Sequence, residues 1–474
     1  MIGNLNVLGC KLETNRGTAE TIAAEDCDLL VSDLEFSFEP TSLETNPVMP
    51  SFGTYENIAG GTQGSVTFKV PFRASGARGI APAIGKLFKA CGMEETVENG
   101  RVKYSPTSTL PTQTITLKAF PGIVKSRTLK GCVGTFTFDA KGNTPLMLDF
   151  AFTGVYESDG DETAPSPIYD NTARILPYLK ACTNLLEYHE ESNRNLTNEG
   201  TGYTLRDTNY TEIAFPLSNA EACELKRIRV HMTREGNPAD FTNGVWLIVS
   251  PDDGGEPNRS IATATSGYVN PETISDEGDW TSFYFNTVGQ LSVADYWVRV
   301  VGDFTESDTD NIVITTTSAP SGGCFRWDGA EWDAGIELVA SAIEVAPLAN
   351  IKTDGFSFDY GNTVNLQQDV CTDEGWLSAF VSGRACTGSI EPEEELSADR
   401  DYFSYVRSAT KLSLSFKIGE DEGQIIEFNA PNTQPISGGS LGNRDDLMTS
   451  PLDLRINNGI PTTSGNDDIE ILFF

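Results

Sequence analysis

Few side chains in this sequence could carry out catalysis or bind a metal. The 474 residues include only two histidines, His189 and His231, which are too few and too far apart along the chain for a histidine-based catalytic or zinc site of the common kinds. Several acidic clusters could offer oxygen ligands to calcium, but none has the twelve-residue loop pattern that ends in a bidentate glutamate. We therefore expect solvated turns at these clusters, which span residues 159–162, 252–253, 308–310 and 467–468.

One glycine-rich segment, residues 79–86, superficially suggests a phosphate-binding loop. Its glycine spacing is one residue too long, and Leu87 stands where a serine or threonine would bind magnesium. The motifs G-x-S-x-G and H-E-x-x-H are absent from the sequence. The nine cysteines occur singly and form no C-x-x-C pair, which argues against a zinc site and a disulfide framework. The sequence therefore predicts no enzyme, no catalytic residue, no metal site and no cofactor.

The chain is strongly acidic. It has 33 lysines and arginines against 68 aspartates and glutamates, a formal charge of −35, so as a whole it repels phosphate backbones. Its composition is that of a globular protein, with 39% hydrophobic and 21% charged residues. No run reaches the roughly 18–20 apolar residues that cross a bilayer, and the first residues lack the basic and hydrophobic regions of a secretory signal. We expect neither membrane insertion nor secretion.

The elements that must position any site are mainly β-strands. Glycine (44) and proline (24) are frequent, and they separate short segments of alternating or β-branched character. One helix is predicted over residues 81–91, with Pro82 in its first turn and Gly92 as its C-cap, and its apolar face should cover a sheet. The strands predicted before it and after it are residues 29–38, 64–72, 114–120, 134–139 and 146–153.

The last 125 residues repeat the outline of the first 160 in the same order. The matched segments are FSF (36–38) with FSF (356–358), GSV (64–66) with GSI (388–390), and ITL (115–117) with LSLSF (412–416). A second short helix is predicted over residues 399–406, between the second and third segments, as the first helix is in the first copy. The pattern predicts a duplicated domain of about 130–150 residues, the alternative being a chance similarity of two β domains.

The middle of the chain differs in composition. Five of the six tryptophans and both histidines lie between residues 185 and 340. Strands predicted at residues 211–217, 225–232, 245–250, 280–286, 296–301 and 312–316 have the spacing of a β-sandwich. Pro/Asp-rich segments, 157–167 and 346–352, look like linkers. We therefore predict a first domain with its linker over residues 1–180, an inserted domain over 185–340 and a second copy over 345–474.

Several collinear segments resemble the tail tube proteins of long-tailed, non-contractile, siphovirus-type bacteriophages. The resemblance covers roughly residues 1–180 and 345–474, and the insertion is a departure from the family. The segments are LETNRGTAETIAAED (12–26), VSDLE (31–35), NPVMPSFG (46–53), GIAPAIGKLFKACG (79–92), GCVGTF (131–136), LDFAFTG (148–154), TGSIEP (387–392) and LGNRDD (441–446).

The resemblance implies a fold and a function. The fold is mainly β: two tandem tail-tube-type β-sandwich or barrel domains, each with a flanking helix, plus the inserted domain. Three two-domain chains would form a pseudo-hexameric ring whose strands join into a β-lined channel, and rings would stack into the tail tube. The implied partners are other copies of the chain, the tape measure protein inside the tube, distal tail and tail terminator proteins, and double-stranded DNA in passage. The location would be the virion tail, assembled in the host cytoplasm.

A long loop should serve ring stacking. Residues 39–61 show little periodicity yet contain several apolar side chains, which is unusual for a free surface loop, the competing interpretation. We interpret them as an inter-ring or inter-subunit arm, with residues 362–384 as the counterpart in the second copy. The apolar side chains assigned to these arms are Val48, Met49, Phe52, Tyr55, Trp376 and Phe380.

The inserted segment resembles jelly-roll sandwich modules, some of which bind carbohydrate, through DYWVRV (295–300) and CFRWDGAEW (324–332). On a tube with an open channel it would project outward, as a spacer or as a weak contact to a host surface glycan. Trp327 and Trp332 with Asp328 and Asp333 form a conceivable glycan patch, although tryptophan in a sandwich is usually a core residue.

Two other functions compete with the tail tube. A cell-surface or carbohydrate-binding adhesin would use the outer domains as scaffold, and the missing signal sequence weighs against it. A sugar-cleaving enzyme would need a pair of catalytic carboxylates, which an acidic, β-rich chain could supply. Glycan binding on an array would support the adhesin, and measurable turnover of a polysaccharide would support the enzyme.

Overall fold

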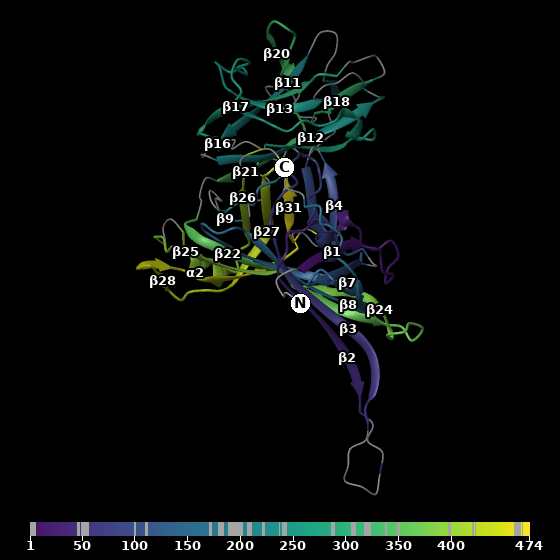
Figure 1. The fold of residues 1–474 in the computed structure, drawn as a ribbon. Coiled ribbons are helices and arrows are strands. Elements are labelled where there is room, and N and C mark those ends of the chain that lie inside the picture. The colour runs from purple at the N-terminus through teal and green to yellow at the C-terminus, as the bar shows by residue number, and fades with distance from the viewer. Residues whose placement is uncertain are drawn as a thin grey trace. The chain divides into compact units, whose positions relative to one another are not determined.

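The computed structural model divides the chain into two compact units, which we describe separately (Figure 1). Unit 1 comprises residues 1–188 and 350–474, and unit 2 comprises residues 189–349. The structure describes residues 6–44, 48, 56–98, 101–109, 112–169, 173–178, 184–187, 202–205, 211–219, 223–236, 238, 244–285, 290–304, 310–316, 324–336, 339–347, 351–396, 400–419, 421, 423–458, 466 and 468–474.

Unit 1 is built mainly from antiparallel strands, which confirms the predicted mainly β fold class. In its first part the strands are β1 (Asn6–Leu12), β2 (Ser32–Leu43), β3 (Ile58–Pro71), β4 (Met93–Glu98), β5 (Arg101–Pro106), β6 (Ile115–Pro121), β7 (Lys125–Lys141) and β8 (Met147–Asp161). In its second part they are β9 (Asn184–Glu187), β22 (Thr353–Asp359), β23 (Asn362–Gln368), β24 (Trp376–Arg384), β25 (Thr387–Pro392), β26 (Leu412–Ile418), β27 (Ile426–Ser437), β28 (Gly442–Arg444), β29 (Leu447–Thr449), β30 (Leu452–Ile456) and β31 (Glu470–Phe473).

Two short helices accompany these strands, and both differ from the predicted bounds. Helix α1 covers Gly85–Ala90 and not residues 81–91, because the segment before it forms a turn in which the Gly85 N–H donates to the carbonyl of Pro82. Helix α2 covers Tyr402–Ser408, where the Asp401 side chain accepts a hydrogen bond from the Ser404 N–H and so caps the N-terminus. The predicted first residue, Asp399, lies outside the described residues.

The two parts of unit 1 have the same strand order. In the first, neighbouring strands follow the order β2-β3-β8-β7-β6-β1. In the second, they follow β22-β25-β30-β27-β26-β9. Each element of one series has a counterpart at the same place in the other, and each series carries its short helix between its second and third long strands. Strand β9 holds the position of β1, so unit 2 enters the chain between the first and second strands of the second series.

Local pairing is also the same in the two series. Ser37 lies opposite Ser65 across β2 and β3, and Ser357 lies opposite Ser389 across β22 and β25. The hydroxyl oxygens are 2.8 Å apart in the first pair and 2.7 Å apart in the second. The next residue pair matches as well, because Phe38 lies opposite Gly64 and Phe358 lies opposite Gly388. The resemblance between the two parts therefore extends to single residue pairs.

Two strand pairs, β7 with β22 and β5 with β31, connect the two parts of unit 1 within a single 15-stranded sheet. The end of β7 runs antiparallel to β22, from the pair Lys141 and Gly355 to the pair Thr137 and Asp359. The core beneath this junction is continuous: the Phe138 ring lies 5.2 Å from that of Phe358 and 5.5 Å from that of Phe428. Both parts thus share one hydrophobic core.

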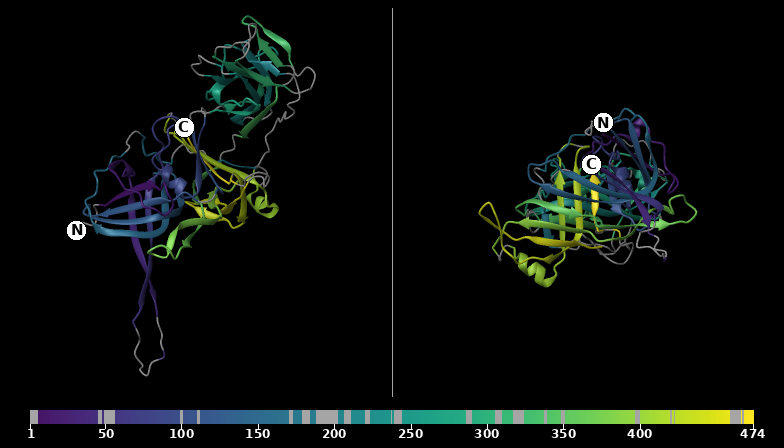
Figure 2. Two further views of the ribbon diagram at one scale, coloured as in Figure 1. Left: turned by 90° about the vertical axis from the view of Figure 1, so that its right-hand side faces the viewer. Right: turned by 60° about the horizontal axis from the view of Figure 1, so that its bottom comes forward.

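The hairpins that follow the first strand of each series differ. Strands β2 and β3 continue as a two-stranded ribbon away from the rest of unit 1, drawn in purple in Figure 2. In the second series the chain bends at Gly361, which has a φ of 65°, and forms the separate hairpin β23–β24. That hairpin packs on the first part of unit 1: the Arg16 guanidinium donates to the Ala379 carbonyl at 3.2 Å, and the Asn362 amide donates to the Gly134 carbonyl at 2.9 Å.

Unit 2 is a sandwich of two antiparallel sheets around its own hydrophobic core. The first sheet has β10 (Gly202–Thr204), β12 (Cys223–Glu235), β15 (Asp279–Tyr284), β16 (Gln290–Leu291), β18 (Asn311–Thr315) and β21 (Ser341–Pro347). The second has β11 (Glu212–Asn219), β13 (Val245–Pro251), β14 (Ala264–Thr265), β17 (Ala294–Gly302), β19 (Cys324–Trp327) and β20 (Trp332–Ile336). These strands include all six that the sequence predicted in this region.

Candidate functional site

The central sheet of unit 1 has one apolar and one polar face. Side chains alternate along each strand, so the residues that face away from the core form a second surface. On the core side lie large rings such as Phe68, Phe136 and Phe358, all of them buried. On the opposite side nine side chains are short and hydroxylated, and they come from strands β2, β3, β8, β7, β22 and β25. They are Ser37, Ser65, Thr67, Thr135, Thr137, Thr153, Ser357, Thr387 and Ser389.

This surface, which we name the polar face, carries more acids than bases. Between the β7 bulge at residues 130–133 and the ends of the strands, eight carboxylates accompany three cations. The carboxylates are Asp33, Glu35, Glu39, Asp139, Asp149, Asp359, Glu391 and Asp453, and the cations are Lys69, Lys141 and Arg455. The polar face is therefore a hydrophilic wall with a negative balance of charge and without large apolar side chains.

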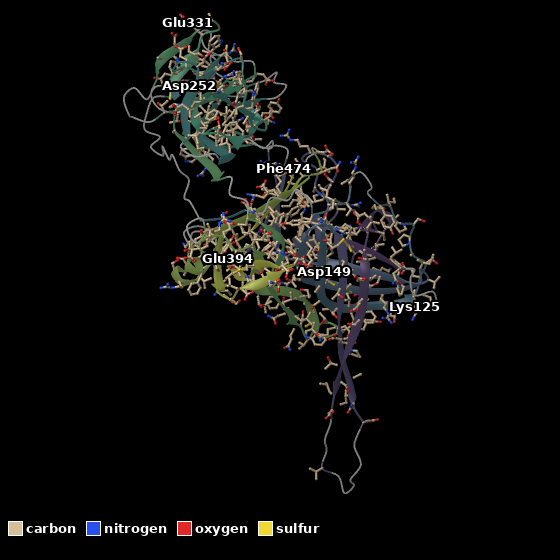
Figure 3. The ribbon with its side chains drawn as sticks, turned by 90° about the vertical axis from the view of Figure 1, so that its left-hand side faces the viewer. Lys125, Asp149, Asp252, Glu331, Glu394 and Phe474 are labelled. Atoms are coloured by element: carbon tan, nitrogen blue, oxygen red, sulfur yellow. The ribbon has the colours of Figure 1, made fainter. Side chains whose placement is uncertain are left out.

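The cations on the polar face are partly neutralised by these acids. The Lys69 ammonium lies 3.6 Å from an Asp33 oxygen and 3.7 Å from an Asp149 oxygen, and Lys141 lies 3.0 Å from Asp139. Partial burial raises the pKa of the Asp149 carboxyl, Lys69 opposes that rise, and Asp33 adds to it. Figure 3 labels Asp149 in this sheet. Two lysines on the polar face are thus held by carboxylates, which lowers their capacity to bind other anions.

A cleft of 610 Å³ opens elsewhere in unit 1 between the β4 region and the β24 hairpin. Four of its charged groups are paired: the Lys89 ammonium lies 2.7 Å from a Glu95 oxygen, and Arg384 Nε lies 2.7 Å from an Asp468 oxygen. Among the described residues, no group of three or more His, Cys, Asp or Glu side chains could hold a metal ion. The cleft therefore shows polar surface without an arrangement suited to catalysis.

The described cysteines are structural. Cys10, Cys27, Cys91, Cys132, Cys324 and Cys386 are buried free thiols, and Cys371 is an exposed one. Burial raises the pKa of Cys10 to about 12 and that of Cys27 to about 11, so neither is a thiolate at neutral pH. The six buried thiols pack as small apolar groups.

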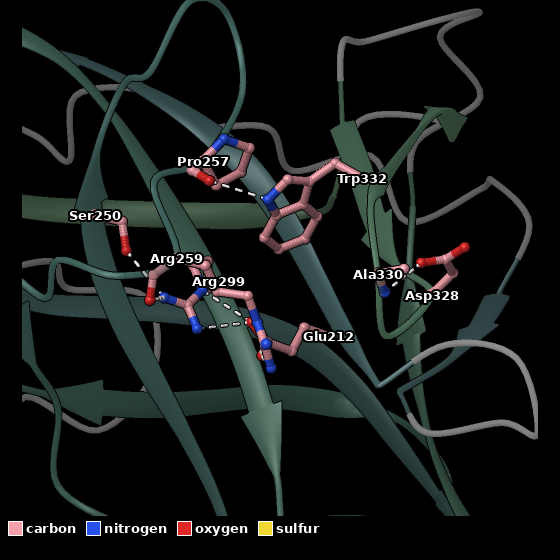
Figure 4. Close-up of polar contacts among 8 residues, drawn as sticks. All are labelled: Glu212, Ser250, Pro257, Arg259, Arg299, Asp328, Ala330 and Trp332. Atoms are coloured by element: carbon pink, nitrogen blue, oxygen red, sulfur yellow. Dashed lines mark hydrogen bonds and ion pairs between the residues drawn. The ribbon is translucent and has the colours of Figure 1, made fainter.

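In unit 2 the four residues of the predicted glycan patch have different environments. Trp332 is buried, and its ring N–H donates to the Pro257 carbonyl at 2.9 Å (Figure 4). Trp327 lies edge-on to Trp332 at 5.2 Å, and the guanidinium of Arg259 covers it at 4.5 Å. Asp328 accepts two backbone hydrogen bonds in the turn that follows β19, and Asp333 is half-buried on β20. Glycan binding by these residues stays a prediction.

Beside these tryptophans lies a buried charge network that the sequence did not reveal. Glu212 bonds Arg259 at 2.5 Å through one carboxylate oxygen and Arg299 at 2.8 Å through the other, as Figure 4 shows. Arg299 also donates to the Ser250 hydroxyl at 3.2 Å. Glu212 and Arg299 are both buried, and the network pairs their charges inside unit 2. Arg259 and Arg299 therefore have a structural role in unit 2.

The predicted arm residues are described in part. Val48 is fully exposed at the end of the β2–β3 ribbon, whereas Met49, Phe52 and Tyr55 lie outside the described residues. Trp376 and Phe380 are half-buried on β24, in the hairpin that packs on the first part of the same chain. The role of either segment in contacts between rings or subunits stays a prediction.

The fold of unit 1 and its polar face indicate the class of protein. Unit 1 is a repetitive β protein with a wide polar sheet face, and no helix in the described part of the chain is long and apolar enough to span a membrane. A family model described as phage tail tube protein matches residues 3–216, while no curated protein matches the chain. The match over residues 3–216 confirms the predicted resemblance to phage tail tube proteins, and it indicates a structural protein of the virion tail.

The family match covers the first strand series but not the whole chain. It begins at residue 3, ahead of β1, and ends at residue 216, within β11 of unit 2. It therefore includes all strands of the first series, and it does not extend to residues 345–474. A structural family of this kind implies a non-enzymatic role. That the second series is another tube domain stays a prediction, which its strand order supports.

Proposed function

We propose that three copies of this chain close into a ring, and that such rings stack into the tube of the phage tail. The two strand series of unit 1 act as two tube domains, so three chains supply six domains and a pseudo-sixfold ring. The equal strand order and the equal Ser37–Ser65 and Ser357–Ser389 contacts support this count. Closure also removes open sheet edges, which would otherwise pair without control.

The polar face carries the second part of the proposal, because it suits the wall of a channel for DNA. The duplex presents one negative charge per ~1.7 Å of its axis, and a wall rich in free cations would hold it by counterion release. The polar face has eight carboxylates against three cations and short hydroxylated side chains between them. Across a gap near the ~8 Å Debye length, the repulsion is weak, yet it centres the duplex and keeps friction low.

The remaining parts follow from this arrangement. Residues 1–180 form the first tube domain with its linker, residues 345–474 form the second, and strand β9 completes it at the position of β1. The inserted domain, predicted over residues 185–340, lies on the outside of the tube, because DNA must pass through the inside. The β2–β3 arm contacts neighbouring subunits or rings. The tape measure protein fills the channel before DNA does, and terminator and distal tail proteins cover the tube ends.

A change in the charge of the polar face tests this function. Thr67, Thr137 and Thr153 are replaced together by lysine in one variant and by glutamine in the control, which adds similar length without charge. If the face lines the channel, tails of the lysine variant release DNA more slowly than glutamine-variant tails, and added salt reduces the difference. Equal release rates from properly assembled tails of both kinds would contradict the proposal.

A further inference from the structure

The junction inside unit 1 provides a template for the junction between chains. Five residue pairs join β7 to β22, from Lys141 and Gly355 to Thr137 and Asp359. Two backbone hydrogen bonds extend it: the Gly142 N–H donates to the Asp354 carbonyl at 2.7 Å, and the Tyr360 N–H donates to the Phe136 carbonyl at 3.0 Å. The first series thus contributes the end of its β7–β8 hairpin, and the second contributes its first long strand.

Each series also has the complementary half of this junction, and in one chain both halves lack their partner strand. Strand β2 is the counterpart of β22, and in the described part of the chain it pairs with β3 alone. Strands β28 and β29 continue the β27–β30 hairpin and so correspond to the end of β7–β8. Among the described residues, β28 pairs only with β29. One chain therefore ends in two open strands of complementary type.

Apolar side chains on the two open strands are more exposed than their counterparts at the internal junction. Phe356 and Phe358 on β22 are each 2% exposed, whereas their counterparts Phe36 and Phe38 on β2 are only half-buried. Met448 on β29 is 54% exposed, whereas Leu148, at the equivalent place on β8, is fully buried. The apolar side chains that the internal junction covers are thus uncovered at both open ends.

We propose that β28 of one chain pairs antiparallel with β2 of the next and copies the β7–β22 junction. The register follows from the strand pairs within one chain. Gly64 pairs with Gly154 and Gly388 with Leu454, so β8 and β30 correspond with a shift of 300 residues. Leu148 then matches Met448, and their partners Phe138 and Asn443 match each other. Because Phe138 pairs with Phe358, the counterpart of Phe38, Asn443 pairs with Phe38 of the neighbouring chain.

This register is favourable for charge. It places Arg444 opposite Ser37, on the polar face, with Glu35 and Glu39 at the two diagonal positions of the neighbouring strand. Diagonal neighbours in an antiparallel pair lie within reach of a long side chain. In its own chain Arg444 lies 3.1 Å from an Asp354 oxygen and 3.6 Å from a Glu393 oxygen. One guanidinium would thus link carboxylates of two chains at the seam.

This inference rests on the proposed ring, and its test uses paired cysteines in assembled tails. In a Cys371→Ser background, Ser37→Cys is combined with Arg444→Cys, a pair that the register places face to face. The control combines Glu39→Cys with Arg444→Cys, because Glu39 lies two residues along β2 from Ser37, which adds about 6.8 Å and exceeds the Cα separation of a disulfide. Asp139→Cys with Ser357→Cys is the positive control, because these residues are already paired within the chain.

On oxidation, the Ser37/Arg444 pair should give a ladder of linked chains that ends at the trimer, whereas the Glu39/Arg444 pair should stay monomeric on a denaturing gel. Intact tails without this ladder, or an equal ladder in the control pair, would overturn the seam and leave the tube function standing. Tails without rings would instead contradict the proposed function. Cryo-EM of wild-type tails gives a second answer: residues 442–446 should lie beside β2 at each chain boundary, and any other strand there refutes the seam.

Discussion

The two strand series of unit 1 differ in what lies beside their first long strand. Strand β22 lies between β25 and β7, and its two phenylalanines are buried. Strand β2 has β3 on one side, and its two phenylalanines are half-buried. The same FSF segment therefore has two environments in one molecule. The first long strand of the second series thus has a neighbouring strand on both sides within the chain. The first long strand of the first series needs a second chain to provide its second neighbour.

The hairpins extend this comparison. In the second series β23–β24 folds onto the first part of unit 1, and the Thr62 N–H donates to the Glu374 carboxylate at 2.5 Å. The β2–β3 ribbon of the first series remains exposed, with Leu43 and Ile58 each more than half exposed. Two equivalent hairpins thus differ because one has a neighbouring series within the chain and the other does not.

The largest expected effect comes from removing one ring at equivalent places. Phe358→Ala should destabilise the isolated chain by about 3–5 kcal/mol, because it leaves a cavity under the internal junction. Phe38→Ala should cost only about 1–2 kcal/mol, because the ring is half-exposed before assembly. Denaturant unfolding of both variants measures the difference. Equal losses in the isolated chain would break the comparison, and normal tail assembly by Phe38→Ala would weaken the role given to β2.

The next largest effect is a loss of stability on adding a side chain at equivalent glycines, and it should be equal in the two series. A Cβ added at Gly64 would lie 2.7 Å from the Ser37 carbonyl oxygen, and one added at Gly388 would lie 2.9 Å from that of Ser357. Gly64→Ala and Gly388→Ala should each destabilise unit 1 by about 1–3 kcal/mol. Gly160→Ala is the control, because its Cβ would meet nothing within 4 Å. A large difference between the first two midpoints of unfolding would show that the series are not equivalent.

A charge reversal sharpens the comparison at the open end. Arg444→Glu should lower the yield of assembled tube roughly tenfold, which corresponds to about 1.4 kcal/mol per contact. Arg455→Glu makes the same change on β30, whose place in the sheet is away from the seam, and should leave assembly nearly unchanged. Sedimentation of assembled material measures the yield, and circular dichroism checks that both chains fold. Equal yields for the two variants would argue against Arg444 as a seam residue.

The smallest expected effect is a pH dependence of stability, and it should arise from the first series alone. The pKa of Asp149 is raised in the folded chain, so the native state retains its proton to higher pH than the unfolded state. Stability should therefore fall as the pH rises from about 4 through the folded pKa. Asp149→Asn should remove this fall from calorimetric midpoints. The equivalent position in the second series is Thr449, and Thr449→Asn should not change the profile. An unchanged slope in Asp149→Asn would contradict this assignment.

Much of this organisation could be predicted from the sequence. Alternating residues identified β3, β6, β7 and β8, and the FSF and GSV/GSI segments identified counterparts that pair in the same register. The short strands β1 and β9 were not predicted, because their sequences have no regular alternation and they depend on pairing with β6 and β26. Helix α1 was predicted too long because the turn at Pro82 resembles a helix start.

The site was less predictable than the fold. The acidic composition indicated a negative wall but did not show which carboxylates share a sheet face, because that depends on strands far apart in sequence, such as β3 and β8. The Glu212 network joins residues 47 and 87 positions apart, a distance at which no local pattern gives a signal. Trp332 was placed in a conceivable glycan patch from its type alone, and its bond to the Pro257 carbonyl depends on tertiary contacts.

The central claim is that the polar face of unit 1 lines a channel formed by three chains. Cryo-EM reconstruction of purified tails tests it most directly. We expect three chains in each ring, six similar strand series around the channel, and Ser65, Thr153 and Ser389 facing the lumen among a majority of carboxylates. A ring of six chains, a channel lined by the phenylalanine side of the sheet, or a wall with more free cations than carboxylates would contradict the account.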